Sequence, residues 1–145
     1  MSRQIKNIIA ITVFLICIGL INVAGQNIEI EIRGMNAFTF ILIIAVLLQV
    51  IFFIPSFLLK TEKYYDLVGS LTYITTISLA YLSVENKTMI DSIIYFYVMV
   101  WALRLGIYLF RRVRNDGKDV RFEKAKKHFF WFLQYWMGQA LWVSL

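Results

Sequence analysis

The chain has 145 residues, of which 60% are hydrophobic, and a formal net charge of +6. Its mean hydropathy of +0.69 exceeds what a water-soluble domain needs to fill one core, which excludes a soluble globular protein and places most apolar surface in lipid. The basic residues lie beside apolar segments rather than in a soluble domain, which argues against nucleic acid as a partner.

The apolar segments are about 17 to 25 residues long, the length at which an α-helix crosses the hydrocarbon core of a bilayer. A helix also satisfies its own backbone hydrogen bonds in lipid. We therefore predict an all-α fold, a polytopic transmembrane bundle of about five helices that forms a single domain over residues 1–145. The predicted spans cover about residues 8–24, 35–59, 67–84, 90–110 and 129–145.

The first span follows Arg3 and Lys6, which is also how a secretory signal peptide begins. Asn22 stands where a cleavage site prefers a small residue, so an uncleaved helix is the favoured interpretation. In the link over 26–34, isoleucines alternate with glutamates, which predicts an extended loop at the interface.

In the second span Pro55 predicts a kink or an end to the helix, because proline lacks an N–H and its ring clashes with the preceding turn. Asp66, at the start of the third span, is predicted to cap that helix. The third span is rich in hydroxyl side chains over residues 70–78, which indicates that it faces other helices rather than lipid. These are Ser70, Thr72, Tyr73, Thr75, Thr76 and Ser78.

Arg104 is the one full charge well inside a span, and such residues are costly in lipid. With Tyr97, Trp101 and Tyr108 it forms one stripe along the fourth span. Two interpretations stay open. Either this stripe, together with Tyr73, faces a pocket or the bundle, or the long arginine side chain reaches the headgroup region at the end of the helix.

The only long hydrophilic stretch is the basic loop 111–128. Twelve Lys and Arg residues would share one side of the membrane with this loop and the N-terminus, against two on the other side. We therefore predict a multi-pass protein with a cytoplasmic N-terminus, in the plasma membrane or the inner membrane if the source is bacterial. The lipid bilayer is its expected environment, and anionic headgroups are expected partners of the basic loop.

Motifs for chemistry are sparse. We find no paired carboxylates, no nucleophile with its base, no nucleotide-binding glycine pattern and no metal-ligand cluster, so no metal is expected and the catalytic residues stay unassigned. The single cysteine, Cys17, lies within the first apolar run. The loop around Gly117 is able to turn, and its Arg and Lys residues suit a phosphate from a nucleotide or a lipid.

Separated sequence strings carry a resemblance to a known family: Phe53-Ile54-Pro55 leading to TEKYYDLVGSLTY (61–73), WALRLG (101–106) and GKDVRF (117–122). Together they resemble the uncharacterised branch of the steroid 5-alpha-reductase-like membrane family, domain of unknown function 1295. The resemblance begins at about Pro55 and corresponds to the N-terminal half of such proteins. It therefore implies a longer architecture and a C-terminal-half partner chain.

Members of that superfamily are helical membrane reductases or, in a related branch, methyltransferases. The reductases use cytosolic NADPH to reduce a double bond conjugated to a carbonyl in a lipid or sterol, and an Asn-x-Gly-Arg turn helps to hold the cofactor. Asn115, Gly117 and Lys118 are similar in place and type, and with Arg121 they are the cofactor-binding residues that the resemblance implies. Lysine lacks the bidentate fork of arginine. The glutamate that precedes the proline in characterised reductases has no counterpart before Pro55.

We therefore expect a truncated or split member of an NADPH-dependent oxidoreductase family, a membrane-embedded steroid or lipid reductase-like protein that is inactive as an isolated chain. Whether the chain is itself an enzyme stays open. The alternative is a non-enzymatic small polytopic membrane protein that binds anionic lipid or a partner helix bundle.

Overall fold

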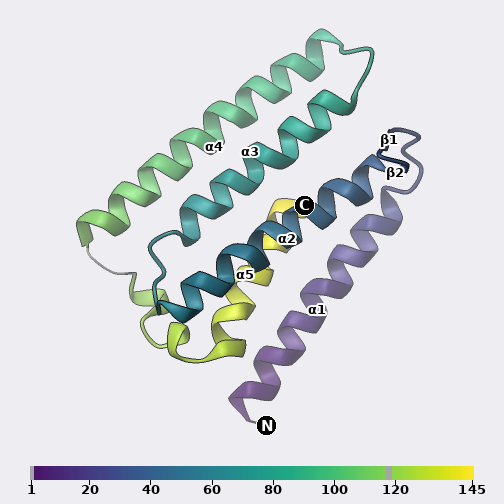
Figure 1. The fold of residues 1–145 in the computed structure, drawn as a ribbon. Coiled ribbons are helices and arrows are strands. Elements are labelled where there is room, and N and C mark those ends of the chain that lie inside the picture. Colours follow the sequence, from purple (N-terminus) through teal and green to yellow (C-terminus); the bar gives the residue numbers. More distant parts are fainter. Residues whose placement is uncertain (1, 117–118) are drawn as a thin grey trace.

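The computed structural model describes residues 2–116 and 119–145, and it confirms the all-α fold (Figure 1). The elements follow in the order α1 (Arg3–Ala24), β1 (Glu31–Ile32), β2 (Met35–Asn36), α2 (Ala37–Leu58), α3 (Tyr65–Ser83), α4 (Met89–Asp116), η1 (Val120–Phe122), η2 (Ala125–Lys127) and α5 (Phe129–Ser144). Strand structure among the described residues is limited to the two-residue pairing of β1 with β2. Strand β1 lies in the segment predicted as an extended loop, and β2 takes the first two residues of the predicted second span.

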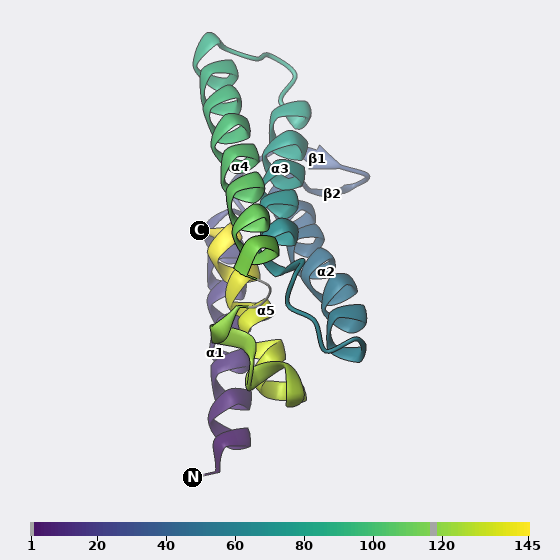
Figure 2. The same cartoon turned by 90° about the vertical axis from the view of Figure 1, so that its left-hand side faces the viewer.

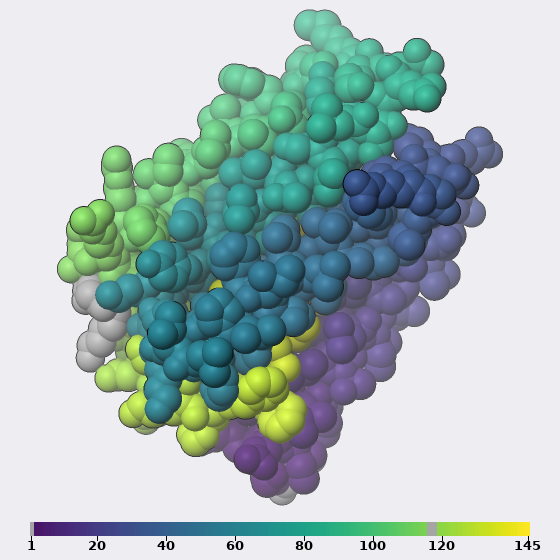
Figure 3. Space-filling model, viewed as in Figure 1, coloured from purple at the N-terminus to yellow at the C-terminus, as the bar shows by residue number. Residues whose placement is uncertain are grey.

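The helices form a bundle in which α1 and α4 lie at opposite edges (Figures 1 and 2). Helix α5 packs against α1, α2 and α3, whereas α4 packs mainly against α3. Figure 3 shows α2 lying across one face, with the α3–α4 pair and α1 on either side of it. The N-terminus, the end of α4 and the start of α5 lie toward the same end of the bundle.

Local chemistry sets the helix starts and ends. The Ser2 hydroxyl accepts a hydrogen bond from the Ile5 N–H at 3.4 Å, so α1 begins several residues before its apolar run. The Asn36 side chain accepts hydrogen bonds from two backbone N–H groups in the first turn of α2. Pro55 lies within the last turn of α2, and the helix continues to Leu58.

The predicted end of the fourth span at residue 110 is wrong as a helix boundary, because α4 continues to Asp116. Arg111, Arg112 and Arg114 are therefore helical, and the loop between α4 and α5 is shorter than 111–128. The physical reason is that arginine is a good helix former, so the helix outlasts its apolar run. Arg104 consequently lies about three turns from the end of α4.

An aromatic core holds the segment after α4 against the bundle. Its buried members are Phe53, Val68, Phe122, Phe132, Trp136 and Met137. Phe122 comes from η1, and its ring centroid is 4.7 Å from that of Tyr65. The short helices η1 and η2 are thus anchored in the core of the protein.

Three helices, α1, α2 and α4, are long and apolar enough to cross a membrane, and we conclude that the chain is a membrane protein. Helix α5 has 16 residues, which is about 24 Å of helix against a hydrocarbon core of about 30 Å. Five passes and a cytoplasmic N-terminus therefore stay predictions.

The hydroxyl groups of α3 meet other helices in part. Ser70 donates a hydrogen bond to the Ala102 carbonyl of α4 at 2.6 Å, and Thr72 accepts one from the Gln49 amide of α2 at 2.9 Å. Thr75 instead donates to a carbonyl of its own helix. The expectation that α3 faces protein thus holds for Ser70 and Thr72, both of which are buried. It also holds for Tyr73 and Ser78, whose hydroxyl groups contact α5 and α4 respectively.

Candidate functional site

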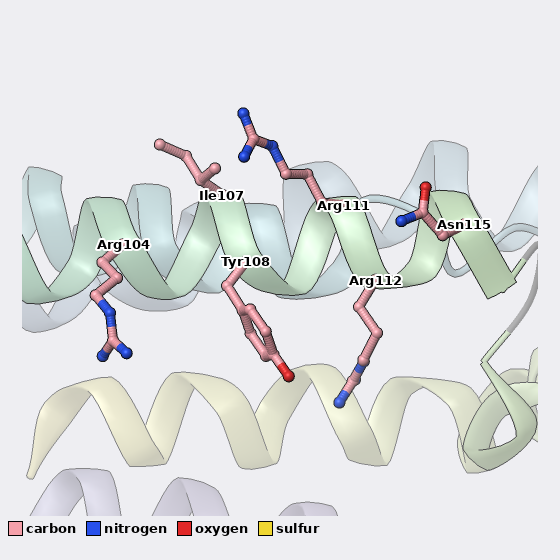
Figure 4. A pocket seen from close by; sticks show the side chains of 6 residues that line it. All are labelled: Arg104, Ile107, Tyr108, Arg111, Arg112 and Asn115. Carbon is pink, nitrogen blue, oxygen red and sulfur yellow. The ribbon is translucent and has the colours of Figure 1, made fainter.

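The last turns of α4 line an open groove with a volume of about 580 Å³ (Figure 4). We call it the α4 groove. Its described lining residues are Arg104, Ile107, Tyr108, Arg111, Arg112 and Asn115. Three of these six are arginines and none is acidic, so the groove is strongly cationic.

Helical periodicity produces this arrangement. Arg104, Tyr108 and Arg112 recur at intervals of four residues, so they share one side of α4. In Figure 4 these three side chains extend toward α5, whereas Ile107 and Arg111, which helical spacing places on the same face of α4, extend away from α5. The sequence thus places two guanidinium groups and a phenol along one side of a single helix.

Among the residues whose side chains the structure describes, Arg104 and Arg111 have no carboxylate within salt-bridge distance. Guanidinium groups present planar, bidentate N–H donors that match phosphate oxygens, and Asn115 adds an amide. The side chain of Tyr108 is 64% exposed, so its ring is free for stacking. The α4 groove is therefore equipped to bind a phosphate-bearing ligand with a flat ring, but its described residues include no nucleophile or general base for chemistry.

The predicted stripe on α4 is brought together only in part. Arg104 and Tyr108 line the α4 groove, whereas Trp101 makes an edge-on ring contact with Tyr73 at 5.0 Å. The Tyr73 hydroxyl donates a hydrogen bond to the Trp142 carbonyl of α5 at 3.1 Å. Tyr97, Trp101, Arg104 and Tyr108 are all exposed on the outside of the described bundle. Arg104 is thus a groove residue rather than a buried partner of another helix.

Beside the α4 groove lies a set of paired charges, the ionic clasp, formed by Glu62, Asp66, Arg112, Asp119, Arg121 and Lys126. Glu62 is only 4% exposed. One carboxylate oxygen of Glu62 pairs with the Lys126 ammonium at 2.6 Å, and the other accepts a hydrogen bond from the Asp119 N–H at 3.2 Å. This residue joins the α2–α3 turn to the segment that precedes α5.

The other two carboxylates of the clasp, Asp66 and Asp119, are contacted by Arg121 and Arg112. Arg121 Nε donates to both carboxylate oxygens of Asp119 at 3.0 Å, and Arg121 Nη2 lies 3.4 Å from Asp66. Arg112 Nη2 lies 3.7 Å from an oxygen of each of these two carboxylates, so Arg112 belongs to both the clasp and the groove. Among the described residues, Asp119 and Arg121 are thus each other's nearest charged partner.

The protonation behaviour of the clasp follows from these contacts. The hydrogen bonds from Arg121 lower the pKa of Asp119, and the same bonds raise the pKa of Arg121. For Asp66, which precedes the predicted third span, burial raises the pKa because desolvation outweighs the nearby arginines. The expectation that Asp66 caps α3 is wrong as a side-chain cap, although Asp66 lies in the first turn of α3, where a carboxylate favours the helix dipole. The N-cap is Tyr64, without a side-chain cap, and the Asp66 carboxylate faces the two arginines instead.

The implied cofactor-binding residues fall into different environments. Asn115 lines the α4 groove, and Arg121 is engaged in the ionic clasp. Gly117 and Lys118 lie outside the described residues. Sequence reasoning missed Arg111 and Arg112 as groove residues because they were placed in a loop. Continuing the helical spacing from Arg104 beyond the apolar run would have found them.

Fold and site together define a helical membrane protein with a cationic groove at one end of the bundle. The family described as "Protein of unknown function (DUF1295)" matches residues 52–145, well over half of the chain, and the chain belongs to this family. The matched region contains the α4 groove and the ionic clasp. No curated protein and no solved structure matches the chain.

Proposed function

We propose that this chain is a membrane-embedded reductase-like protein and that its α4 groove binds the phosphate groups of NADPH. The observation that carries the proposal is that three arginines and Asn115 line one groove. Arg104 and Arg111 have no described carboxylate partner, whereas Arg112 also faces two carboxylates of the ionic clasp. The resemblance to the steroid 5-alpha-reductase-like family supports the choice of cofactor, since its reductases use NADPH.

The arginines and Tyr108 of the groove would contact different parts of the cofactor. The arginines hold phosphate oxygens through charge-assisted hydrogen bonds, and the exposed Tyr108 ring offers a stacking surface for a base. When bound, NADPH supplies a hydride for a double bond conjugated to a carbonyl in a lipid. The chain's own residues bind and orient the cofactor.

The α4 groove is open to its surroundings on one side. Hydride transfer needs a site from which water is excluded, and a cofactor in this groove would stay exposed on one side. We therefore propose a partner chain, the C-terminal half of the family architecture, whose helices close the groove. The position of α4, which packs mainly against α3, leaves its other side open for such a partner.

The proposed orientation fits cofactor supply. The α4 groove lies near the end of α4, toward the same end of the bundle as the N-terminus (Figure 1). The excess of basic residues on that side favours the cytoplasm, where NADPH is available. Chemical labelling of single cysteines introduced at Lys6 and Arg33 tests this orientation, and labelling of the Lys6 position from outside the cell would contradict it.

The proposed function is tested by NADPH binding to the purified chain in detergent, read by cofactor fluorescence. The titration is made with the chain alone and with any same-family chain that is encoded directly downstream. We expect binding at least in the mixture. No binding in either preparation would reject the reductase proposal and leave the non-enzymatic alternative, a membrane scaffold that binds anionic lipid or a partner helix bundle.

A further inference from the structure

A second cluster of cationic and aromatic side chains lies where α1 and α5 begin. We call it the headgroup cluster: Arg3, Lys6, Lys127, His128 and Trp131. The Arg3 guanidinium lies over the Trp131 ring at 4.7 Å from its centroid, and the His128 ring stacks on the same indole at 6.0 Å between centroids. The cluster thus joins the first turn of the chain to the start of the last helix.

The geometry points to a binding site for the phosphate of an anionic phospholipid at this cluster. A guanidinium that lies over an indole uses its flat face, while its N–H donors at the edge stay available for phosphate oxygens. Among the described residues, Arg3 has no carboxylate within salt-bridge distance. Lys6 lies one turn further along α1, on the same side of the helix as Arg3, and Lys127 directly precedes His128 in the sequence.

The surroundings favour a lipid over a soluble phosphate. Ile5, Ile8, Phe129 and Phe130 are exposed apolar residues near the cationic ones in sequence, on the first turns of α1 and α5. A phospholipid would place its phosphate beside the cations at the start of the two helices and its acyl chains along the apolar surface that follows. Tryptophan is also a typical residue of the membrane–water interface. The site is separate from the α4 groove and does not depend on the proposed function.

A bound lipid would tie α1 to α5. These helices pack against each other, and a phosphate held by Arg3 would lie at the start of α5, beside Trp131 and His128. A ligand that binds only the folded state raises the unfolding temperature. Anionic lipid should therefore stabilise the protein against heat, and the effect should depend on this cluster.

The test is thermal unfolding of the full chain in neutral detergent with added phosphatidylglycerol, phosphatidylcholine of the same acyl chains, or glycerol 3-phosphate. We expect phosphatidylglycerol to raise the unfolding temperature of the wild type by about 3–6 °C, with little effect of the other two. The rise should be largely lost in Arg3→Gln and Lys6→Gln, each compared with its own lipid-free sample.

The matched control is Arg33→Gln, because Arg33 is an exposed arginine in the β1–β2 turn at the other end of the bundle. This variant should keep the full rise. The inference is overturned if Arg3→Gln keeps it, if Arg33→Gln loses it equally, or if phosphatidylcholine matches phosphatidylglycerol. Equal protection by glycerol 3-phosphate would also overturn it, in favour of a soluble phosphate ligand.

Discussion

The ionic clasp and the α4 groove lie next to each other and use the same kinds of cation, yet their cations have opposite surroundings. In the clasp, Lys126 and Arg121 each contact a carboxylate within 3 Å. In the groove, Arg104 and Arg111 have no such partner among the described residues. Arg112 takes part in both.

A cation's role in this region is therefore decided by its partners rather than by its position in the sequence. A paired arginine is already satisfied and would have to leave its carboxylate to hold a phosphate. An unpaired arginine in a groove gains from any anion that enters. Paired cations in this region therefore hold the fold, whereas unpaired cations are available to a ligand.

The largest effect is expected from Glu62→Gln. The change removes the charge partner of Lys126 and weakens the acceptor for the Asp119 N–H inside a nearly buried site. Removing one member of a buried pair leaves the other uncompensated, so we expect a loss of about 2–3 kcal/mol in the free energy of unfolding, reduced by the partial exposure of Lys126. Equilibrium unfolding in detergent measures it.

The matched control for Glu62 is Glu29→Gln, an exposed glutamate before the β1–β2 hairpin. This control should change the free energy of unfolding by less than about 0.5 kcal/mol. A loss below about 1 kcal/mol in Glu62→Gln would show that the clasp does not hold the fold.

The next effect concerns the contact that positions the groove. A Cβ added at Gly106 would lie 2.4 Å from Ser70 Oγ and 2.6 Å from its Cβ, so Gly106→Ala must push α3 and α4 apart. We expect a loss of about 1–2 kcal/mol in the free energy of unfolding. Gly19→Ala is the control, because nothing lies within 4 Å of its added Cβ. It should be neutral or stabilising by up to about 1 kcal/mol, and equal effects of the two changes would contradict this account.

A smaller effect is expected from Arg121→Gln. The side chain of Arg121 is 52% exposed, and solvent screening limits exposed ion pairs to about 0.2–1 kcal/mol. The free energy of unfolding should fall by less than about 1 kcal/mol, measured in the same way. A loss as large as that of Glu62→Gln would place the main strength of the clasp in its exposed pair.

The smallest effect on stability is expected from Arg104→Gln. Arg104 is exposed and has no described carboxylate partner, so the free energy of unfolding should change by less than about 0.5 kcal/mol. If the variant instead fails to fold, Arg104 supports the bundle and is not a ligand-binding residue of an open groove.

The sequence predicted those features that depend on the hydrophobicity of one continuous segment. Apolar length predicted the five α-helices but not the short helices η1 and η2, and the start of α5 at Phe129 is confirmed to the residue. The prediction failed at the end of α4, because the helix extends beyond the apolar segment that would lie in the hydrocarbon core. Arg111 and Arg112 were therefore assigned to a loop, although helical spacing places them beside Arg104.

The clasp was beyond local reasoning for a different reason. Glu62 and Lys126 are 64 residues apart, and no short pattern in the sequence marks such a pair. The Asp66 prediction failed similarly, because its partners Arg112 and Arg121 come from the far end of α4 and from η1. Long-range charge pairing depends on how the helices pack, and packing is visible only in the folded protein.

We propose that the phosphates of NADPH bind in the α4 groove and not at the ionic clasp. The most direct test compares NADPH titrations of the wild type, Arg104→Gln/Arg111→Gln and Arg121→Gln, in the preparation that binds the cofactor. The account predicts at least about tenfold weaker binding for the groove variant and less than about twofold for Arg121→Gln. Equal weakening by Arg121→Gln, or unchanged binding by the groove variant, would contradict it.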